Sequence, residues 1–135
     1  LARDLSRDVP NVTFTCAPVE AMVPARQYAC VVSIALLHYL SDEQFAKAVE
    51  LVRRSTRPGG LAVFRESFGC DRRFELHGFY SSVLDAEYHA VYRTMEELVG
   101  RMGSEFAAIH EETSLSSTAE KPETCQKIVI FRRHA

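Results

Sequence analysis

The sequence predicts an α/β fold with a mostly parallel sheet that ends in an antiparallel hairpin. Residues 28–33 form an apolar, β-branched run without alternation, which is typical of a strand buried on both faces of a parallel sheet. A helical pattern over 42–54 separates this run from a second apolar run at 61–64, and such a strand–helix–strand unit requires a parallel pair. Two further strands, expected at 106–113 and 127–132, are joined by a polar loop and must therefore pair antiparallel.

Both predicted helices carry start signals. Ser41 and Gln44 form a capping-box pattern before the first helix, and Thr94 and Glu97 repeat this pattern before the second. Apolar residues then recur at helical spacing in both segments. The first helix runs into Arg-Pro-Gly-Gly at 57–60, which predicts a stop and a tight turn.

Four other segments carry weaker patterns. Residues 1–8 suit the last turns of a helix, and residues 12–16 alternate as a strand does. Residues 17–26 contain two prolines and are expected to form a loop. Residues 68–93 are rich in aromatic and charged side chains but have no clean period, so we expect a short helical or irregular insertion there.

Composition narrows the function without naming it. The 135 residues suffice for a single domain. The balance of 16 basic against 18 acidic side chains argues against nonspecific electrostatic binding of nucleic acid. The longest apolar stretch, 28–37, is too short to span a membrane. The cysteines lack C-x-x-C spacing, and no metal-ligand cluster is visible. Because Cys16 and Cys30 fall in predicted strands, we expect buried free thiols in a reducing, cytoplasmic compartment, although a targeting segment ahead of Leu1 stays open.

Several of these segments together resemble one family. Residues 28–43, Tyr-Ala-Cys-Val-Val-Ser-Ile-Ala-Leu-Leu-His-Tyr-Leu-Ser-Asp-Glu, resemble the fourth strand and following loop of class I S-adenosylmethionine-dependent methyltransferases. Residues 57–60 resemble the turn before their fifth strand, and residues 12–17 fall where their third strand lies. The closing hairpin agrees with the family's reversed last strand. Residues 64–67, Phe-Arg-Glu-Ser, also look like the fifth strand end of plant-type phosphoethanolamine N-methyltransferases.

The resemblance implies a Rossmann-like sheet, S-adenosylmethionine as cofactor and a small-molecule methyl acceptor. The family's acidic, glycine-rich segment after its first strand, and the acidic residue that ends its second strand, have no counterpart in this sequence. The chain therefore corresponds to a C-terminal, partial methyltransferase domain over 1–135 with the N-terminal strands missing. We expect a gap in its sheet and an exposed edge through which a homodimer can form.

The carboxyl ends of the parallel strands are the ligand-binding positions in such a fold. The resemblance implies cofactor contacts from the residues that follow the third and fourth strands, namely Ala17, Pro18, Val19, Ser33, Ile34 and Ala35. A simple loop turn and a plain strand end are the alternative interpretations of these two segments. His38 is the candidate catalytic base near an acceptor amine, with local hydrogen bonding as its alternative.

Acceptor contacts are expected from two further places. The residues after the fifth strand and the aromatic insertion, which would act as a lid, supply the candidates Arg65, Glu66, Ser67, Tyr80, Tyr88 and Tyr92. The charged residues can instead form an ion pair, and the aromatic rings can instead bury hydrophobic edges. Aromatic faces attract ammonium and sulfonium cations.

The implied mechanism is an in-line methyl transfer in which the protein aligns the reactants and excludes water, with no metal required. A second hypothesis is a non-catalytic methyltransferase-like fragment that serves as an interaction or structural subunit. A third is another Rossmann-like enzyme such as a dehydrogenase, and the antiparallel terminal hairpin argues against it.

Overall fold

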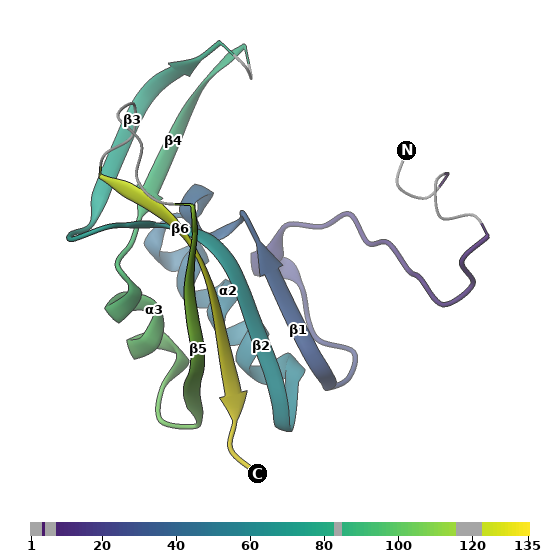
Figure 1. Cartoon of the computed structure of the whole chain (residues 1–135). Coiled ribbons are helices and arrows are strands. Elements are labelled where there is room, and N and C mark those ends of the chain that lie inside the picture. Colours follow the sequence, from purple (N-terminus) through teal and green to yellow (C-terminus); the bar gives the residue numbers. More distant parts are fainter. Residues whose placement is uncertain (1–3, 5–7, 83–84, 116–122) are drawn as a thin grey trace.

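The computed structural model describes residues 4, 8–82, 85–115 and 123–135, which form a mixed sheet with helices on one face and a separate hairpin (Figure 1). The strands are β1 (Tyr28–Ile34), β2 (Thr56–Gly69), β3 (Phe74–Ser81), β4 (Ala86–Tyr92), β5 (Phe106–Leu115) and β6 (Thr124–Arg133). The helices are α2 (Asp42–Ser55) and α3 (Met95–Met102), with 3-10 turns η1 (Val19–Ala21) and η2 (Leu37–Tyr39). In this part of the chain, neither helix is long and apolar enough to cross a bilayer.

The predicted topology is confirmed. The sheet has the order β1–β2–β6–β5, and β1 pairs parallel with β2 across the α2 connection. Strand β6 pairs antiparallel with both of its neighbours, β2 and β5. The C-terminal hairpin therefore reverses the direction of an otherwise parallel arrangement, as the sequence pattern indicates.

Both predicted capping boxes are present. The Ser41 hydroxyl accepts a hydrogen bond from the Gln44 backbone N–H at 3.3 Å, and the Gln44 side chain accepts one from the Ser41 N–H at 3.0 Å. Thr94 and Glu97 make the same reciprocal pair at 3.3 and 2.8 Å. Helix α2 ends at Ser55, just before residues 57–60, as predicted, but these residues lie inside β2 rather than ahead of it. They form a local irregularity, because β2 advances from Thr56 to Leu61 while β1 advances only from Tyr28 to Cys30, and Gly59 has φ = 72°.

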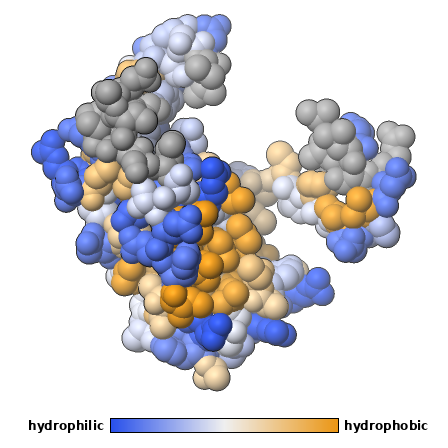
Figure 2. All heavy atoms as spheres, in the orientation of Figure 1, coloured by the Kyte–Doolittle hydropathy of each residue, from blue (hydrophilic) through white to orange (hydrophobic). Residues whose placement is uncertain are grey.

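The hydrophobic core lies between one face of the sheet and the two helices. Alternate residues of β2, such as Phe64 and Phe68, point to this side with Val129 and Phe131 of β6. The opposite face carries no described helix, and Figure 2 shows apolar surface spread over it. Val32, Ile34 and Ile109 are about half exposed on the molecule's surface.

The strand predicted at 12–16 is wrong. This segment lies outside both sheets, and Figure 1 shows the N-terminal chain reaching away from β1. Alternation predicts a strand only where a neighbouring strand accepts its backbone hydrogen bonds, and no described strand lies beside it. Cys16 and Cys30 are consequently exposed rather than buried, Cys30 on the uncovered side of β1. The helix predicted at 1–8 falls mostly outside the described residues.

The insertion predicted at 68–93 is also different. Most of it forms the antiparallel hairpin β3–β4 rather than a helical or irregular segment. A register shift between Leu76 and Phe79 interrupts the strand period, which explains why the sequence shows no clean alternation. Strand β5 continues to Leu115, and β6 begins at Thr124, so both strands of the C-terminal hairpin are longer than predicted. The loop between them lies mostly outside the described residues.

Gly69 ends β2 where the chain turns toward the hairpin. A Cβ atom at this position would lie 1.9 Å from the Arg72 carbonyl oxygen, so no side chain fits without moving the backbone. We expect Gly69→Ala to lower the free energy of unfolding by about 2 kcal/mol or more. Urea denaturation followed by circular dichroism measures this change.

Gly100 is the matched control, because it lies in α3 with nothing within 4 Å of an added Cβ. Gly100→Ala should raise the free energy of unfolding by about 0.5–1 kcal/mol through better helix propensity. Equal effects of the two substitutions would contradict the close approach at Gly69.

Candidate active site

A groove of about 810 Å³ lies between the N-terminal segment, β1 and α2. Of the six predicted cofactor residues, Ala17, Val19, Ser33 and Ile34 line it together. Pro18 and Ala35 are their immediate neighbours in the chain, Pro18 as the residue that precedes η1. The lining is largely apolar, and its volume falls within the roughly 300–1,000 Å³ of small-molecule sites. The two sequence segments that the resemblance assigns to the cofactor thus meet at one groove.

The chain kinks sharply where β1 ends. Ala35 has φ = 51°, in the left-handed region that residues other than glycine rarely adopt. Its N–H donates to the Arg65 carbonyl oxygen at 3.0 Å, which fixes the kink to β2. Such strain costs on the order of 1 kcal/mol and persists only where surrounding contacts impose it, often at functional sites.

Glu66 supplies those contacts from beneath the kink. Its side chain is completely buried, and its carboxylate accepts hydrogen bonds from the Ser33 hydroxyl at 2.7 Å and from two backbone N–H groups, those of Leu36 and Leu37, at 2.9 and 3.0 Å. Burying a carboxylate is costly unless hydrogen bonds replace its hydration. Glu66 therefore holds the loop after β1, and a direct contact with an acceptor would require the loop to open.

The three acceptor candidates of β2 do not point to the same side of the sheet. Alternation along β2 points Glu66 inward, whereas Arg65 is exposed on the other face, with Ser67 on the same side. An ion pair between Arg65 and Glu66 is incompatible with these opposite directions. Only Glu66 lies beside the loop that follows the groove-lining strand.

His38 lies under the same loop. Its ring is 8% exposed, stacks on Tyr92 with centroids 5.6 Å apart, and contacts Tyr39 at 4.0 Å. Its Nδ1 atom is 3.9 Å from a Glu66 carboxylate oxygen and has no hydrogen-bond partner among the described residues. The imidazole is therefore nearly closed off from solvent, whereas the Tyr39 ring beside it is 53% exposed.

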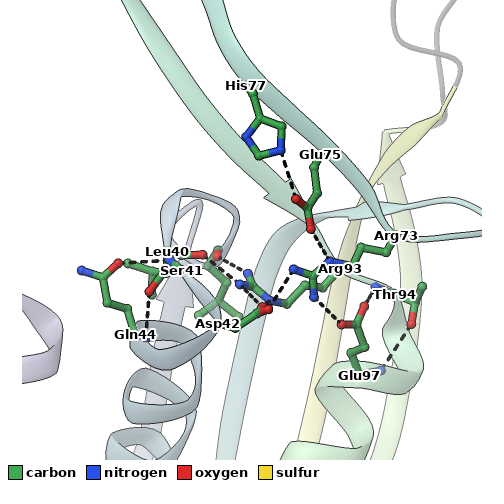
Figure 3. Close-up of polar contacts among 11 residues, drawn as sticks. Leu40, Ser41, Asp42, Gln44, Arg73, Glu75, His77, Arg93, Thr94 and Glu97 are labelled. Carbon is green, nitrogen blue, oxygen red and sulfur yellow. Dashed lines mark hydrogen bonds and ion pairs between the residues drawn. The ribbon is translucent and has the colours of Figure 1, made fainter.

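Arg93 holds the opposite end of the loop, and the sequence analysis did not identify this role. Its buried guanidinium donates to the carbonyl oxygens of Leu37 and Leu40 at 3.0 and 2.8 Å, and to the Asp42 carboxylate at 2.7 Å (Figure 3). The guanidinium also lies 4.3 Å from the Phe45 ring centroid. The available signal was an arginine directly before the Thr94 helix cap, but its partners are more than 50 residues away in sequence.

Arg73 joins the same network from the start of the hairpin. It donates to Asp42 at 3.0 Å, to Glu97 at 3.1 Å and to Glu75 at 2.7 Å (Figure 3). The hydrogen bonds from Arg73 and Arg93 lower the pKa of Asp42 below its usual value. The two arginines therefore fix both ends of the β3–β4 hairpin to the starts of α2 and α3.

The hairpin sorts the aromatic candidates onto two faces. Cross-strand partners share a face, so Tyr88 lies with Phe79, and Tyr80 lies with Glu87 on the other side. Tyr92 alternates in phase with Tyr88 and faces the loop, where burial and the phenols of Tyr88 and Tyr39 raise the pKa of Tyr92 to about 12. The Tyr80 hydroxyl donates instead to Asp85, at the hairpin tip. Tyr88 and Tyr92 thus come together, and Tyr80 does not join them.

Comparison with solved structures shows which fold this is. Across 98% of its length the chain matches the N-methyltransferase NodS of Bradyrhizobium japonicum, solved with S-adenosylhomocysteine, at 16% identity and a TM-score of 0.64. Across 99% it matches the 1,6-didemethyltoxoflavin N1-methyltransferase of Burkholderia thailandensis, solved with its substrate and S-adenosylhomocysteine, at 12% identity and a TM-score of 0.72. It also matches the [4+2]-cyclase SpnF across 99% of its length, at 14% identity and a TM-score of 0.68.

The chain therefore has the fold of the S-adenosylmethionine-dependent methyltransferases, and the fold prediction is confirmed. It spans 59%, 56% and 61% of the NodS, toxoflavin enzyme and cyclase chains respectively. No protein-family model and no curated sequence matches it. Among the described residues, no group of three histidine, cysteine or acidic side chains is placed to hold a metal ion.

The Glu66 carboxylate is the testable centre of this site. In Glu66→Gln a side-chain NH₂ group replaces one acceptor oxygen and faces hydrogen-bond donors, so at least one buried group loses its partner. We expect the free energy of unfolding to fall by about 1–3 kcal/mol, as measured by chemical denaturation.

Glu112→Gln serves as the control, because Glu112 is exposed on β5 and, among the described residues, its side chain pairs with His110 at 3.4 Å. It should change stability by less than about 0.5 kcal/mol. A Glu66→Gln protein as stable as this control would show that the buried carboxylate does not hold the loop.

Proposed function

We propose that this chain forms the C-terminal part of an S-adenosylmethionine-dependent methyltransferase that transfers a methyl group to a small-molecule acceptor. The observation that carries the proposal is the apolar groove that runs along β1 and includes its carboxyl end, in a fold matched over nearly the whole chain by solved methyltransferases. The neighbours with bound S-adenosylhomocysteine support S-adenosylmethionine as the cofactor. Because a [4+2]-cyclase has the same fold, the fold alone does not indicate methyl transfer, and the groove is the stronger support for this function.

On the cofactor side, Ala17, Pro18 and Val19 would contact one end of S-adenosylmethionine, and Ser33, Ile34 and Ala35 the other. The apolar side chains that line the groove suit the adenosyl and thioether parts of this cofactor. Bound there, the cofactor supplies an activated methyl group on a sulfonium that is a good leaving group. The kinked loop at Ala35 would keep this end of the groove rigid and exclude water.

On the acceptor side, the loop and the hairpin would form the wall. Tyr88 and Tyr92 face this loop. We propose that Arg65, Ser67 and Tyr80 contact the acceptor only where the acceptor extends beyond the loop. His38 is the candidate base, and it would accept a proton from a protonated acceptor where its ring meets Tyr39. A phosphoethanolamine-type acceptor remains a prediction from residues 64–67.

A second candidate function is a non-catalytic interaction subunit, and the open edge of β1 favours it. This strand pairs only with β2 among the described strands, and its Val32 and Ile34 side chains are more than half exposed. We propose that two copies can pair along this edge. Sedimentation velocity should then show a concentration-dependent dimer that Val32→Lys weakens, and a monomer at every concentration would contradict the pairing. The four free cysteines support a reducing, cytoplasmic location.

Calorimetric titration with S-adenosylhomocysteine tests the enzyme proposal on the chain as given. We expect sub-millimolar binding, and Ile34→Trp should abolish it because an indole at this exposed position fills the groove. Ile109→Trp is the control, since Ile109 is similarly exposed on β5 and does not line the groove. Equal affinity of both variants would show that the site is misplaced. If this chain fails to bind, binding by a longer chain with an upstream glycine-rich segment would assign the missing contacts to that segment.

A further inference from the structure

A continuous row of aromatic rings crosses from the hairpin to the loop after β1. In order, the ring contacts run through Phe74, Tyr92, His38, Tyr39, Tyr88 and Phe79, with centroids 6.1, 5.6, 4.0, 6.5 and 5.5 Å apart. The middle of the row is buried, because Tyr92 is 6% and His38 is 8% exposed. The end formed by Tyr39, Tyr88 and Phe79 opens to solvent, and we call these three rings the aromatic corner.

The aromatic corner is shaped to contact a compact group from more than one side. Tyr39 and Tyr88 are inclined at 64°, and Tyr88 and Phe79 at 82°. Rings at steep angles turn their faces in different directions, so one small ligand can touch two faces at once. Tyr39 is 53% and Phe79 is 50% exposed, so both rings can be reached by a ligand from solution.

The corner also lies next to the groove along the chain. Leu36 and Leu37 line the groove, and Tyr39 follows them within the same short loop. Glu66 and Arg93 hold this loop from its two ends, so the position of Tyr39 relative to the groove is fixed. A group bound at the corner would therefore lie beside whatever occupies the groove.

The hairpin offers no basic side chain to an anion at the corner, because residues 74–92 contain neither lysine nor arginine. Its acidic side chains lie away from the corner: Glu75 and Glu87 are on the other face of the hairpin, and Asp85 accepts from Tyr80 at the tip. The two arginines that flank the hairpin are committed to carboxylates, Arg93 to Asp42 and Arg73 to Asp42, Glu75 and Glu97. A phosphate or carboxylate at the corner would meet electron-rich ring faces without a free cation in this hairpin.

We infer that the aromatic corner of Tyr39, Tyr88 and Phe79 is the acceptor subsite and that it takes a compact ammonium group without an attached phosphate or carboxylate. The inference rests on the proposed methyltransferase function and deepens it by naming the acceptor class. The negative faces of the three rings would hold the positive charge by cation–π attraction, which hydrophobic contact alone does not supply.

The test compares a cation with its neutral isostere on the same protein. Choline and 3,3-dimethylbutan-1-ol have the same shape and differ in charge, and their binding can be followed by chemical-shift changes of the tyrosine ring protons. We expect choline to bind roughly two- to fivefold more tightly than the alcohol, the ratio that an exposed cation–π contact gives. Phosphocholine should bind more weakly than choline.

Tyr39→Leu and Phe79→Leu should each reduce the preference for choline toward unity, and both positions are exposed enough for the variants to fold, which thermal melts would check. Phe14→Leu is the control, because Phe14 is also exposed, lies outside both sheets and does not line the groove, so this variant should keep the wild-type ratio. Equal binding of choline and the alcohol by the wild-type protein, or loss of the preference in Phe14→Leu, would overturn the subsite.

The titration with S-adenosylhomocysteine distinguishes failure of the acceptor subsite from failure of the proposed methyltransferase function. Binding of S-adenosylhomocysteine without any preference for choline would refute the aromatic corner and leave the methyltransferase proposal standing. A choline preference that the corner variants remove, in a protein that does not bind S-adenosylhomocysteine, would support the subsite and count against methyl transfer.

Discussion

Two buried charges of opposite sign hold the loop after β1, and the candidate site depends on them. The Glu66 carboxylate accepts the N–H groups that begin η2, while the Arg93 guanidinium donates to the carbonyl oxygens of Leu37 and Leu40. The two N–H groups and the Leu40 carbonyl are backbone groups that a single 3-10 turn leaves without internal partners, whereas the Leu37 carbonyl also accepts from the Leu40 N–H at 3.3 Å. A turn of three residues has little stability of its own, so the two ionised side chains define its conformation.

This arrangement couples segments that lie far apart in the sequence. Glu66 belongs to β2, Arg93 ends the hairpin, and Asp42 begins α2, yet all three bear on the same loop. The groove and the aromatic corner are therefore two sides of one loop rather than separate sites. A movement of the hairpin would displace Arg93. Because Arg93 and Glu66 both bind the backbone of Leu37, the movement would also shift Glu66 and its hydrogen-bond partner Ser33.

The sequence predicted those features that arise from local chemistry. Capping boxes at Ser41 and Thr94 and the apolar run at 28–33 are determined by neighbours in the chain, and the structure contains each of them. The segment 12–16 failed as a strand because pairing needs a partner that its own pattern does not specify. The direction of Glu66 and the partners of Arg93 depend on strand register and on packing across more than 25 residues, which no local pattern encodes.

The uncovered sheet face links stability to ligand binding. Val32 and Ile34 belong both to this apolar face and to the groove. An element or partner that covers the face removes apolar surface from water, at about 25 cal/mol per Å². A partner and a ligand that both need Val32 and Ile34 would compete for these side chains, and linkage requires each to weaken the other by the same free energy. Pairing along the β1 edge and binding in the groove are therefore alternative uses of the same apolar surface.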